Sequence, residues 1–319
     1  MMSMLLCDKK IRTRMWGHDR EELMQMARDV ENKKFLPGYK LPKNLEFEPD
    51  DEKIMAGSDL IISAVPCQFI RRVWTRLKKY TMENVPIVSV AKGIENKTLL
   101  RPSQIIKEVL ELSDNSRLAV LSGPTIADEL ARELCATACV AGTNEKLIKK
   151  LQTTFSTTWF RVYTNTDIVG VELAGAMKNI IAIAAGIIDG TKSGDNCKAA
   201  LVTRGLAEIM RLGSAFGAKN ETFIGLTGLG DLVTTCISPT GRNRSFGEKI
   251  GKGQTVEQAQ KSTESVVEGI ATCESVVALA EKMNVEMPIT KAIYEILFQN
   301  KPVQQAIYEL MNRRLKAEI

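Results

Sequence analysis

The sequence of 319 residues is poor in several features that mark particular classes of protein. It has one histidine, His18, and seven cysteines without a Cys-x-x-Cys pair, so no residue set has the spacing of a zinc site and we expect no bound metal. An odd number of scattered cysteines is typical of a reduced intracellular protein. The longest apolar run, residues 180–188, is about half as long as a membrane span. These absences predict a soluble, cytoplasmic protein without a membrane span.

The chain also lacks a strong excess of charge of one sign. Its 43 basic and 38 acidic residues give a formal net charge of +5, and the two kinds are interspersed along the sequence. Because nucleic-acid-binding proteins concentrate positive charge, this distribution argues against nucleic acid as a partner. A small positive excess is compatible with a small anionic substrate.

The first half of the sequence alternates short apolar segments with amphipathic segments of helical length. This alternation predicts an α/β fold with a parallel sheet covered by helices. After about Thr166 the strand pattern ends and helical spacing continues. We therefore expect a doubly wound, Rossmann-like dinucleotide-binding domain at 1–165 and an all-α substrate and catalytic domain at 166–319. Strands are expected at 11–16, 59–65, 87–91, 118–121, 136–140 and 160–163, and helices at 68–80, 102–111, 169–189, 199–216, 255–259, 267–283, 290–299 and 303–313.

Two lysines stand at positions where a lysine can take part in chemistry. Lys178 lies in a segment rich in Ala, Gly and Ile, where burial would lower its pKa toward the range of a general acid or base. The alternative is a lysine at a helix edge whose ammonium group reaches solvent. Lys92 follows the predicted strand 87–91, and ligands of open α/β sheets bind at the carboxyl ends of strands. A solvated loop lysine is the alternative for Lys92.

Two further positions have the composition of anion-binding or cofactor-binding loops. Ser122-Gly-Pro-Thr125 precedes a predicted helix start and offers backbone N–H groups and a hydroxyl to an anion. His18 follows the predicted strand 11–16, where a dinucleotide-binding fold meets the adenosine ribose. Since Asp19 and Arg20 stand beside it, the choice between NAD and NADP stays open.

The segment from Gly225 to Asp231, followed by residues 238–247, combines closely spaced glycines with a carboxylate and a cluster of donors. Its glycines allow another group to approach the backbone closely, because they carry no Cβ. Asp231 can hold Lys178 or a substrate hydroxyl, while Arg242 and Asn243 suit a phosphate oxyanion. A glycine-rich turn before an ordinary basic helix is the other interpretation.

Ten short motifs resemble, in register and from about residue 8 onward, the NAD(P)-dependent glycerol-3-phosphate dehydrogenases of the bacterial type. This resemblance implies interconversion of dihydroxyacetone phosphate and sn-glycerol 3-phosphate for glycerophospholipid synthesis, with NAD or NADP as cofactor. The apolar helix faces of the second half allow either an internal core or a homodimer. The motifs are Trp16-Gly-His, Phe35-Leu-Pro-Gly, Ala64-Val-Pro, Lys92-Gly-Ile, Leu121-Ser-Gly-Pro, Val171-Glu-Leu, Ala176-Met-Lys-Asn, Gly228-Leu-Gly-Asp, Arg242-Asn and Val266-Val-Glu-Gly.

The same resemblance implies roles for individual residues. Lys178 would be the proton donor and acceptor, and Lys92 would contact both substrate and cofactor. Position 241 is usually serine in the family pattern, so Gly241 would contribute a main-chain contact. The substrate site would comprise Lys92, Gly123, Thr125, Lys178, Asp231, Gly241, Arg242 and Asn243. Together with His18, the cofactor contacts would be Lys92, Ala127, Arg242, Val266 and Glu268.

The N-terminus departs from the family pattern. A dinucleotide-binding fold opens with a strand and a G-x-G-x-x-G loop, whereas residues 1–10 resemble the end of the helix that follows such a loop. We therefore expect an N-terminally truncated relative, owing either to a start site placed too far downstream or to a shortened chain with weak cofactor binding. Two other functions stay open. One is a non-catalytic relative that binds a phosphorylated ligand or a partner. The other is a related hydroxyacid or ketopantoate-type reductase, against which Arg242-Asn243 and Gly228-Leu-Gly-Asp231 speak.

Overall fold

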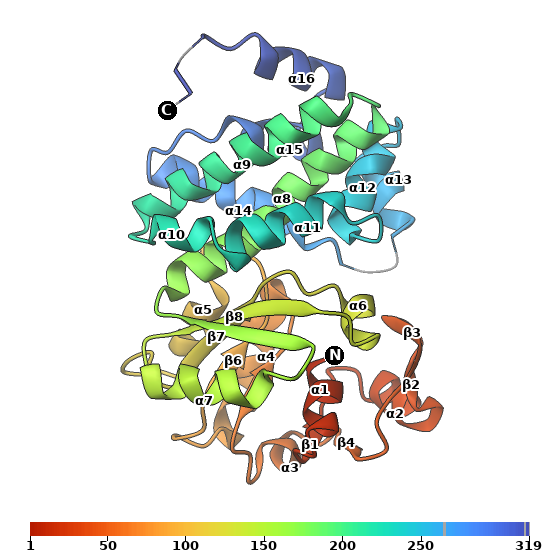
Figure 1. Cartoon of the computed structure of the whole chain (residues 1–319), viewed down its shortest axis with the longest axis vertical. Coiled ribbons are helices and arrows are strands. Elements are labelled where there is room, and N and C mark those ends of the chain that lie inside the picture. The colour runs from red at the N-terminus through yellow and green to blue at the C-terminus, as the bar shows by residue number, and fades with distance from the viewer. Residues whose placement is uncertain (264–265, 316, 319) are drawn as a thin grey trace. The chain divides into compact units, whose positions relative to one another are not determined.

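The structure is a computed structural model that describes residues 1–263, 266–315 and 317–318 (Figure 1). The chain divides into two compact units, each assembled from segments that are separated in the sequence. Unit 1 comprises residues 1–65, 69–91 and 103–168, and unit 2 comprises residues 66–68, 92–102 and those from 169 onward.

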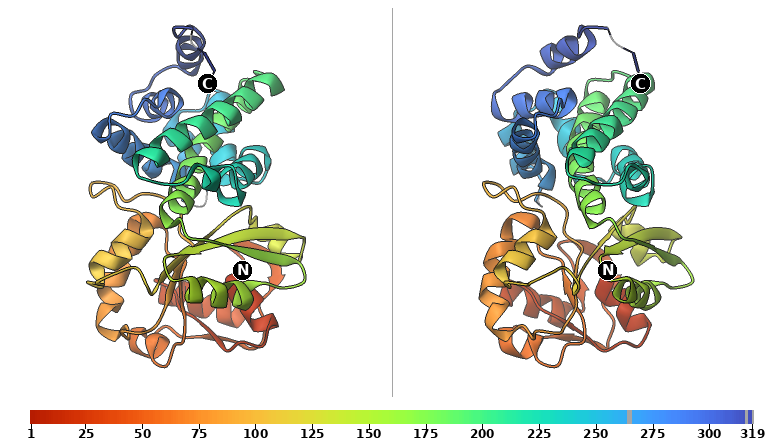
Figure 2. Two further views of the ribbon diagram at one scale, coloured as in Figure 1. Left: turned by 60° about the vertical axis from the view of Figure 1, so that its left-hand side comes forward. Right: turned by 90° about the vertical axis from the view of Figure 1, so that its left-hand side faces the viewer.

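Unit 1 has a main sheet of strand order β5-β6-β7-β8-β9. Figure 2 shows α5 and α7 on opposite faces of this sheet, as in a doubly wound fold. The strand β7 is buried along its whole length, and its first four residues are apolar, as expected for a strand covered on both faces. The strands are β5 (Ile61–Ser63), β6 (Ile87–Ser89), β7 (Leu118–Ser122), β8 (Ala136–Gly142) and β9 (Phe160–Asn165).

The expectation of an all-parallel sheet is wrong at one position. Strand β8 runs antiparallel to β7, while the other neighbouring pairs of this sheet are parallel. The connection between β7 and β8 contains only the short helix α6 (Ala127–Ala131). A parallel crossover usually needs a longer helix to return the chain along the sheet, so the chain reverses direction here instead.

Two smaller strand pairs complete the β-structure of unit 1. Strand β1 (Thr13–Met15) pairs in parallel with β4 (Leu45–Phe47), and β2 (Glu31–Asn32) pairs antiparallel with β3 (Leu36–Lys40). Among the described residues, no strand joins the β1–β4 pair to the main sheet. The helices are α1 (Met2–Asp8), α2 (Arg20–Asp29), α3 (Asp51–Met55), α4 (Ile70–Leu77), α5 (Pro102–Val109) and α7 (Glu145–Phe155), with short 3₁₀ turns at Cys67–Phe69 and Lys78–Tyr80.

Unit 2 is built from helices around α8 (Ile168–Gly190), which is long and apolar enough to span a membrane. The apolar part of α8 is entirely buried inside the protein, so this helix is the core of a soluble unit. The remaining helices are α9 (Asp195–Ala215), α10 (Asn220–Phe223), α11 (Asp231–Ile237), α12 (Arg242–Gly251), α13 (Val256–Lys261), α14 (Glu268–Lys282), α15 (Pro288–Phe298) and α16 (Val303–Met311), with a π-helical turn, η3, at Leu226–Gly230.

Glycines bring α8 and α12 into close contact. A Cβ on Gly186 would lie 1.9 Å from the main-chain oxygen of Arg244, and one on Gly247 would lie 2.0 Å from that of Ile183. Only residues without a side chain fit at these crossing points. The backbone of α12, which carries Arg242 and Asn243, is therefore held directly against the backbone of α8, which carries Lys178.

Candidate active site

Lys178 is a buried lysine in the core helix α8. Its neighbours on the helix are buried and, apart from Asn179, apolar, and the residue itself is only 6% exposed. A long apolar helix forms here because its faces all pack against other helices, so a lysine within it is withdrawn from water. The structure therefore excludes the alternative of a solvent-reaching lysine at a helix edge.

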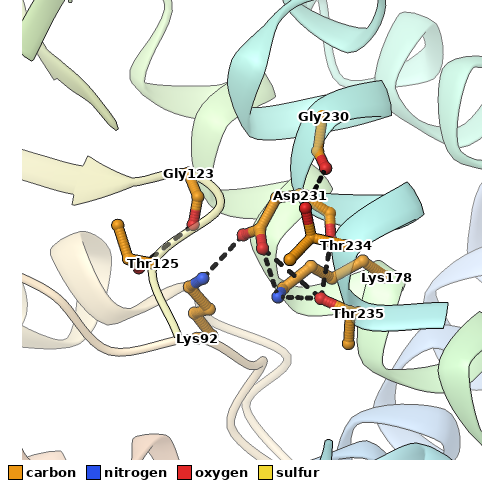
Figure 3. A network of polar contacts seen from close by, with 8 residues as sticks. All are labelled: Lys92, Gly123, Thr125, Lys178, Gly230, Asp231, Thr234 and Thr235. Atoms are coloured by element: carbon orange, nitrogen blue, oxygen red, sulfur yellow. Dashed lines mark hydrogen bonds and ion pairs between the residues drawn. The ribbon is translucent and has the colours of Figure 1, made fainter. Parts of the chain in front are cut away.

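The carboxylate of Asp231 binds Lys178. The Nζ of Lys178 donates to Oδ1 of Asp231 at 2.6 Å, and Asp231 is 2% exposed (Figure 3). Asp231 is the first residue of α11 and directly follows the π-helical turn η3. A Cβ on Gly228 in that turn would lie 1.9 Å from the main-chain oxygen of Phe223, so a glycine is required for this path of the chain. The glycine-rich segment thus delivers the carboxylate to the lysine.

Lys92 reaches the same carboxylate from the other side. Its Nζ donates to Oδ2 of Asp231 at 2.6 Å, which makes Asp231 a bridge between two lysines (Figure 3). The loop that begins at Lys92 belongs to unit 2 and is fastened there. The main-chain oxygen of Ile94 accepts from Gln68 Nε2 at 2.7 Å and from Ser275 Oγ at 3.1 Å. Lys92 is therefore a fixed, partly buried group and not a solvated loop lysine.

The buried cluster of two lysines and one aspartate shifts the pKa values of its members. Burial lowers the pKa of Lys178 to about 8, the ammonium group of Lys92 lowers it as well, and Asp231 opposes both. Burial alone would raise the pKa of Asp231, but the two lysines outweigh it and hold that pKa below its ordinary value. With both lysines protonated the cluster carries one net positive charge, which attracts an anionic ligand.

Thr235 is a member of the cluster that the sequence did not indicate. Its Oγ1 accepts a hydrogen bond from Lys178 Nζ at 2.5 Å and donates to the main-chain oxygen of Asp231 at 2.6 Å. Thr235 lies four residues after Asp231 on α11, so the two side chains share one face of this helix. No helix is predicted over this segment from the sequence, so the spacing could not be used to find Thr235. The adjacent Thr234 instead donates to the main-chain oxygen of Gly230.

The predicted phosphate-binding residues lie at the start of α12. Gly241 is the N-cap of this helix, Arg242 is its first residue and is exposed, and Asn243 follows. The side-chain oxygen of Asn243 accepts from the N–H of Gly269 at 3.0 Å, which ties α12 to α14. The amide nitrogen of Asn243 can then donate to a ligand, as can the guanidinium of Arg242.

Two predicted cofactor contacts, Val266 and Glu268, precede or begin α14 in the same unit. The side chain of Val266 is 52% exposed. Burial raises the pKa of the Glu268 carboxyl, while the positive charges of Arg242, Lys92 and Lys178 act in the opposite direction. Glu268 therefore lies within the electrostatic reach of the lysine cluster.

The other predicted residues belong to unit 1. His18 is exposed after β1, and Asp19 beside it is the N-cap of α2, where its side chain accepts from the N–H of Glu22. Thr125 donates to the main-chain oxygen of Gly123 at 3.1 Å in the turn after β7. Ala127 is the exposed first residue of α6. Across the part of the chain that the structure describes, no group of three or more His, Cys, Asp or Glu residues is placed to hold a metal ion.

Unit 1 has a Rossmann-like α/β arrangement, and unit 2 buries Lys178 beside a carboxylate that it shares with Lys92. These features suit a two-domain dehydrogenase of the nicotinamide-dependent class. Comparison of the chain with known protein families identifies its family within this class. The model described as NAD-dependent glycerol-3-phosphate dehydrogenase N-terminus matches residues 1–148, and the one for the C-terminus matches residues 167–308. The chain belongs to the NAD-dependent glycerol-3-phosphate dehydrogenase family.

Individual relatives are similar over nearly their full length. The glycerol-3-phosphate dehydrogenase [NAD(P)+] of Geobacter sp. (strain M21) is 45% identical over 98% of this chain and 94% of its own length. That of Chlorobium phaeobacteroides (strain BS1) is 43% identical over 100% and 95%. A crystal structure of glycerol-3-phosphate dehydrogenase from Coxiella burnetii is 37% identical, covers 98% of this chain and 95% of that chain, and has a TM-score of 0.94.

These comparisons correct one prediction. The N-terminal family model matches from residue 1, and the relatives are covered over 94% or more of their own length. The interpretation of the chain as a truncated relative is therefore not supported. The absence of a G-x-G-x-x-G motif remains a property of the printed sequence.

Proposed function

We propose that this chain catalyses the reversible, NAD(P)-dependent reduction of dihydroxyacetone phosphate to sn-glycerol 3-phosphate, which supplies glycerophospholipid synthesis. Its membership of the family and the activity for which its relatives are named support the reaction. The observation that carries the chemistry is the buried Lys92–Asp231–Lys178 cluster, because it holds a lysine of lowered pKa against a carboxylate in the middle of a helical core.

Lys178 is the general acid and base in this proposal. As an ammonium group it donates a hydrogen bond to the carbonyl oxygen of the substrate and transfers a proton to that oxygen during reduction. In the reverse direction the neutral amine accepts the proton from the hydroxyl group. A pKa of about 8 makes both protonation states accessible near neutral pH. Asp231 and Thr235 fix the direction of the amine through its other N–H bonds.

In this proposal the phosphate of the substrate is bound by donors of unit 2. Arg242 and Asn243 at the start of α12 supply the guanidinium and amide donors, and Gly241 supplies a main-chain contact. The family resemblance adds Gly123 and Thr125, in the turn after β7, to the proposed substrate contacts. Lys92 lies beside the carbonyl end of the substrate and adds positive charge where the phosphorylated anion binds.

The residues present fit a nicotinamide cofactor. Side chains supply a proton donor in the cluster but no hydride donor, and the cofactor supplies that hydride when bound. His18 is the ribose contact in this proposal, which its exposed position after β1 supports. Ala127, Val266, Glu268, Arg242 and Lys92 are the further cofactor contacts in this proposal. Asp19 and Arg20 beside His18 leave NAD and NADP as equal candidates.

In this proposal residues 1–165 bind the cofactor and residues 166–319 carry the acid–base chemistry. The protein acts in the cytoplasm on a small phosphorylated substrate, without a metal, and a homodimer is compatible with its apolar helix faces.

The test is the dihydroxyacetone phosphate-dependent oxidation of NADH and of NADPH by the purified chain, followed at 340 nm. We expect turnover with at least one cofactor and its loss in Lys178→Ala, with wild-type folding by circular dichroism. A folded wild-type chain that binds dihydroxyacetone phosphate but turns over neither cofactor would overturn the proposal in favour of a non-catalytic relative. Turnover of ketopantoate in its place would favour a reductase of that type.

A further inference from the structure

Unit 2 contains a cavity that no residue of the proposed active site lines. Its volume is about 750 Å³, and it lies between α8, α9, α15 and α16. Figure 1 shows α16 at the top of this unit, above α9 and α15, while α8 runs through its middle. The interior is formed by aliphatic side chains, among them Ile187, Ile188, Leu201, Ile293, Ile296 and Leu310. A cavity of this size and lining is within the range of small-molecule sites, roughly 300–1,000 Å³.

The polar lining of the cavity is dominated by arginine. Arg204 and Arg211 come from α9, while Arg313 and Arg314 follow α16. One of them, Arg313, forms an ion pair with Glu286. Arg204 donates to the main-chain oxygen of Glu318, at 3.4 Å. The described lining has four arginines and two glutamates, Glu208 and Glu286, so it carries net positive charge.

The remaining carboxylate of the lining, that of Glu208, is already satisfied by the protein. Its two oxygens accept from the N–H of Ile289 at 2.6 Å, and from the N–H and hydroxyl of Thr290 at 3.1 and 2.9 Å. Glu208 is 2% exposed and fastens α9 to the start of α15. It is therefore a structural group of the wall and does not compete with a ligand for the arginines.

We propose that this cavity binds a long-chain anionic amphiphile, with the alkyl chain in the aliphatic interior and the anionic head group on Arg204 and Arg314. The interior offers no polar partner to a sugar or nucleotide, whereas an alkyl chain gains from each methylene that it buries. The planar guanidinium groups bind a carboxylate or a phosphate head group through paired hydrogen bonds. A free fatty acid and an alkyl phosphate share this chemistry.

The experiment is calorimetric titration of the full chain, without substrate or cofactor, with decanoate, dodecanoate, dodecyl phosphate and dodecyltrimethylammonium below their micelle concentrations. We expect one site per chain for the anions, with affinity rising up to about fourfold per added methylene. The cationic amphiphile should bind at least about tenfold more weakly. The ratio of the carboxylate to the phosphate affinity distinguishes the two sources of the head group.

Four variants locate the site. The double change Arg204→Ala and Arg314→Ala should weaken dodecanoate binding at least about tenfold. Ala292→Trp fills the interior and should abolish binding; Ala200→Trp, at an exposed lining position that tolerates a large side chain, gives the same test if Ala292→Trp does not fold. Lys291→Ala removes an exposed charge of α15 outside the lining and should leave binding unchanged.

Several results would overturn this inference. Absence of binding by both anions, equal binding of the cationic amphiphile, or binding that survives a folded Ala292→Trp or Ala200→Trp variant would each do so. Sedimentation of the same samples tests the competing explanation that a second copy of the chain covers this region. If no amphiphile binds and a filled cavity converts a dimer to a monomer, a second copy of the chain occupies this region. Since binding is measured without turnover, failure of the proposed reaction would not affect the outcome.

Discussion

Replacing Asp231 by asparagine removes the charge that bridges the two buried lysines. Each lysine Nζ lies 2.6 Å from an oxygen of Asp231. At an effective dielectric constant of about 20, a unit charge pair at this distance attracts by about 6 kcal/mol before desolvation is subtracted. Because Asp231 raises the pKa of Lys178 against burial and Lys92, its loss lowers that pKa below about 8. We expect a decrease of at least about one pH unit, since one pKa unit corresponds to about 1.4 kcal/mol.

The assay is the pH dependence of kcat in both directions, from pH 6 to pH 10 by steps of about half a unit. Reduction of dihydroxyacetone phosphate needs the ammonium form of Lys178, so its rate falls as pH rises through the pKa. Oxidation of glycerol 3-phosphate needs the neutral amine, so its rate rises over the same range. In Asp231→Asn both limbs should move to lower pH, and the maximal rate should fall by about 10²–10⁴-fold.

A matched control is present in the same unit. Asp189 also bridges two cations, with its carboxylate on Lys198 and on Arg244, and its side chain is 17% exposed against 3% for that of Asp231. Asp189→Asn should lower the stability without moving either pH limb, because its partners are not Lys92 or Lys178. If the limbs of Asp231→Asn stay in place or move to higher pH while the protein remains folded, the assignment of the titrating group to this cluster is refuted.

Four other changes test separate parts of the site. Lys178→Met should abolish most turnover. In the wild type the free energy of unfolding should increase as pH rises from about 8 to 10.5, because the lowered pKa of Lys178 destabilises the native state while this lysine is protonated. The variant should lack this increase, which thermal melts across pH will show. Thr235→Val should shift the pH–kcat profile and Thr234→Val should not, since only Thr235 contacts Lys178; unchanged profiles for both would contradict the positioning role. Arg242→Ala should raise KM for dihydroxyacetone phosphate about 10- to 100-fold and be partly restored by Arg242→Lys, whereas an unaltered KM would remove Arg242 from the phosphate site. Gly228→Ala should lower the free energy of unfolding by about 3 kcal/mol or more, because its Cβ would meet the main-chain oxygen of Phe223. A wild-type midpoint in denaturant unfolding would instead show that the turn η3 can accommodate the added Cβ.

Much of the architecture could be predicted, because the composition of a segment and the spacing of its apolar residues indicate which residues are buried. The helix predicted at 169–189 is observed as α8, and the apolar strand predicted at 118–121 is observed as β7. The hairpin of β2 and β3 was not predicted, since Glu31-Asn32 and Leu36–Lys40 are too short and too irregular to show a period of two. The direction of β8 depends on how the short connection closes in space, which no local pattern reports.

The candidate site, like the fold, could be predicted from the sequence only in part. Lys178 could be suggested from its apolar neighbours, and Lys92 from its place after a strand, because each signal is local. The carboxylate that joins them lies 53 residues after Lys178 and 139 residues after Lys92, so the pairing itself follows only from tertiary structure. Thr235 carries no local signal of function, because a threonine on an amphipathic helix has the same surroundings in the sequence whether or not it meets a lysine.

The boundary between the two units has a consequence for how this protein is made. The chain passes between them five times, and the segments 66–68 and 92–102 belong to unit 2 although the rest of that unit starts at residue 169. During synthesis, Lys92 therefore emerges long before the helices that bind its loop, and its position is unsettled until Asp231 and Ser275 have been added. A fragment cut at residue 169 would lack one of the two lysines of its own cluster. Genetic exchange between relatives can therefore preserve the site only if it carries the 92–102 loop together with the C-terminal helices.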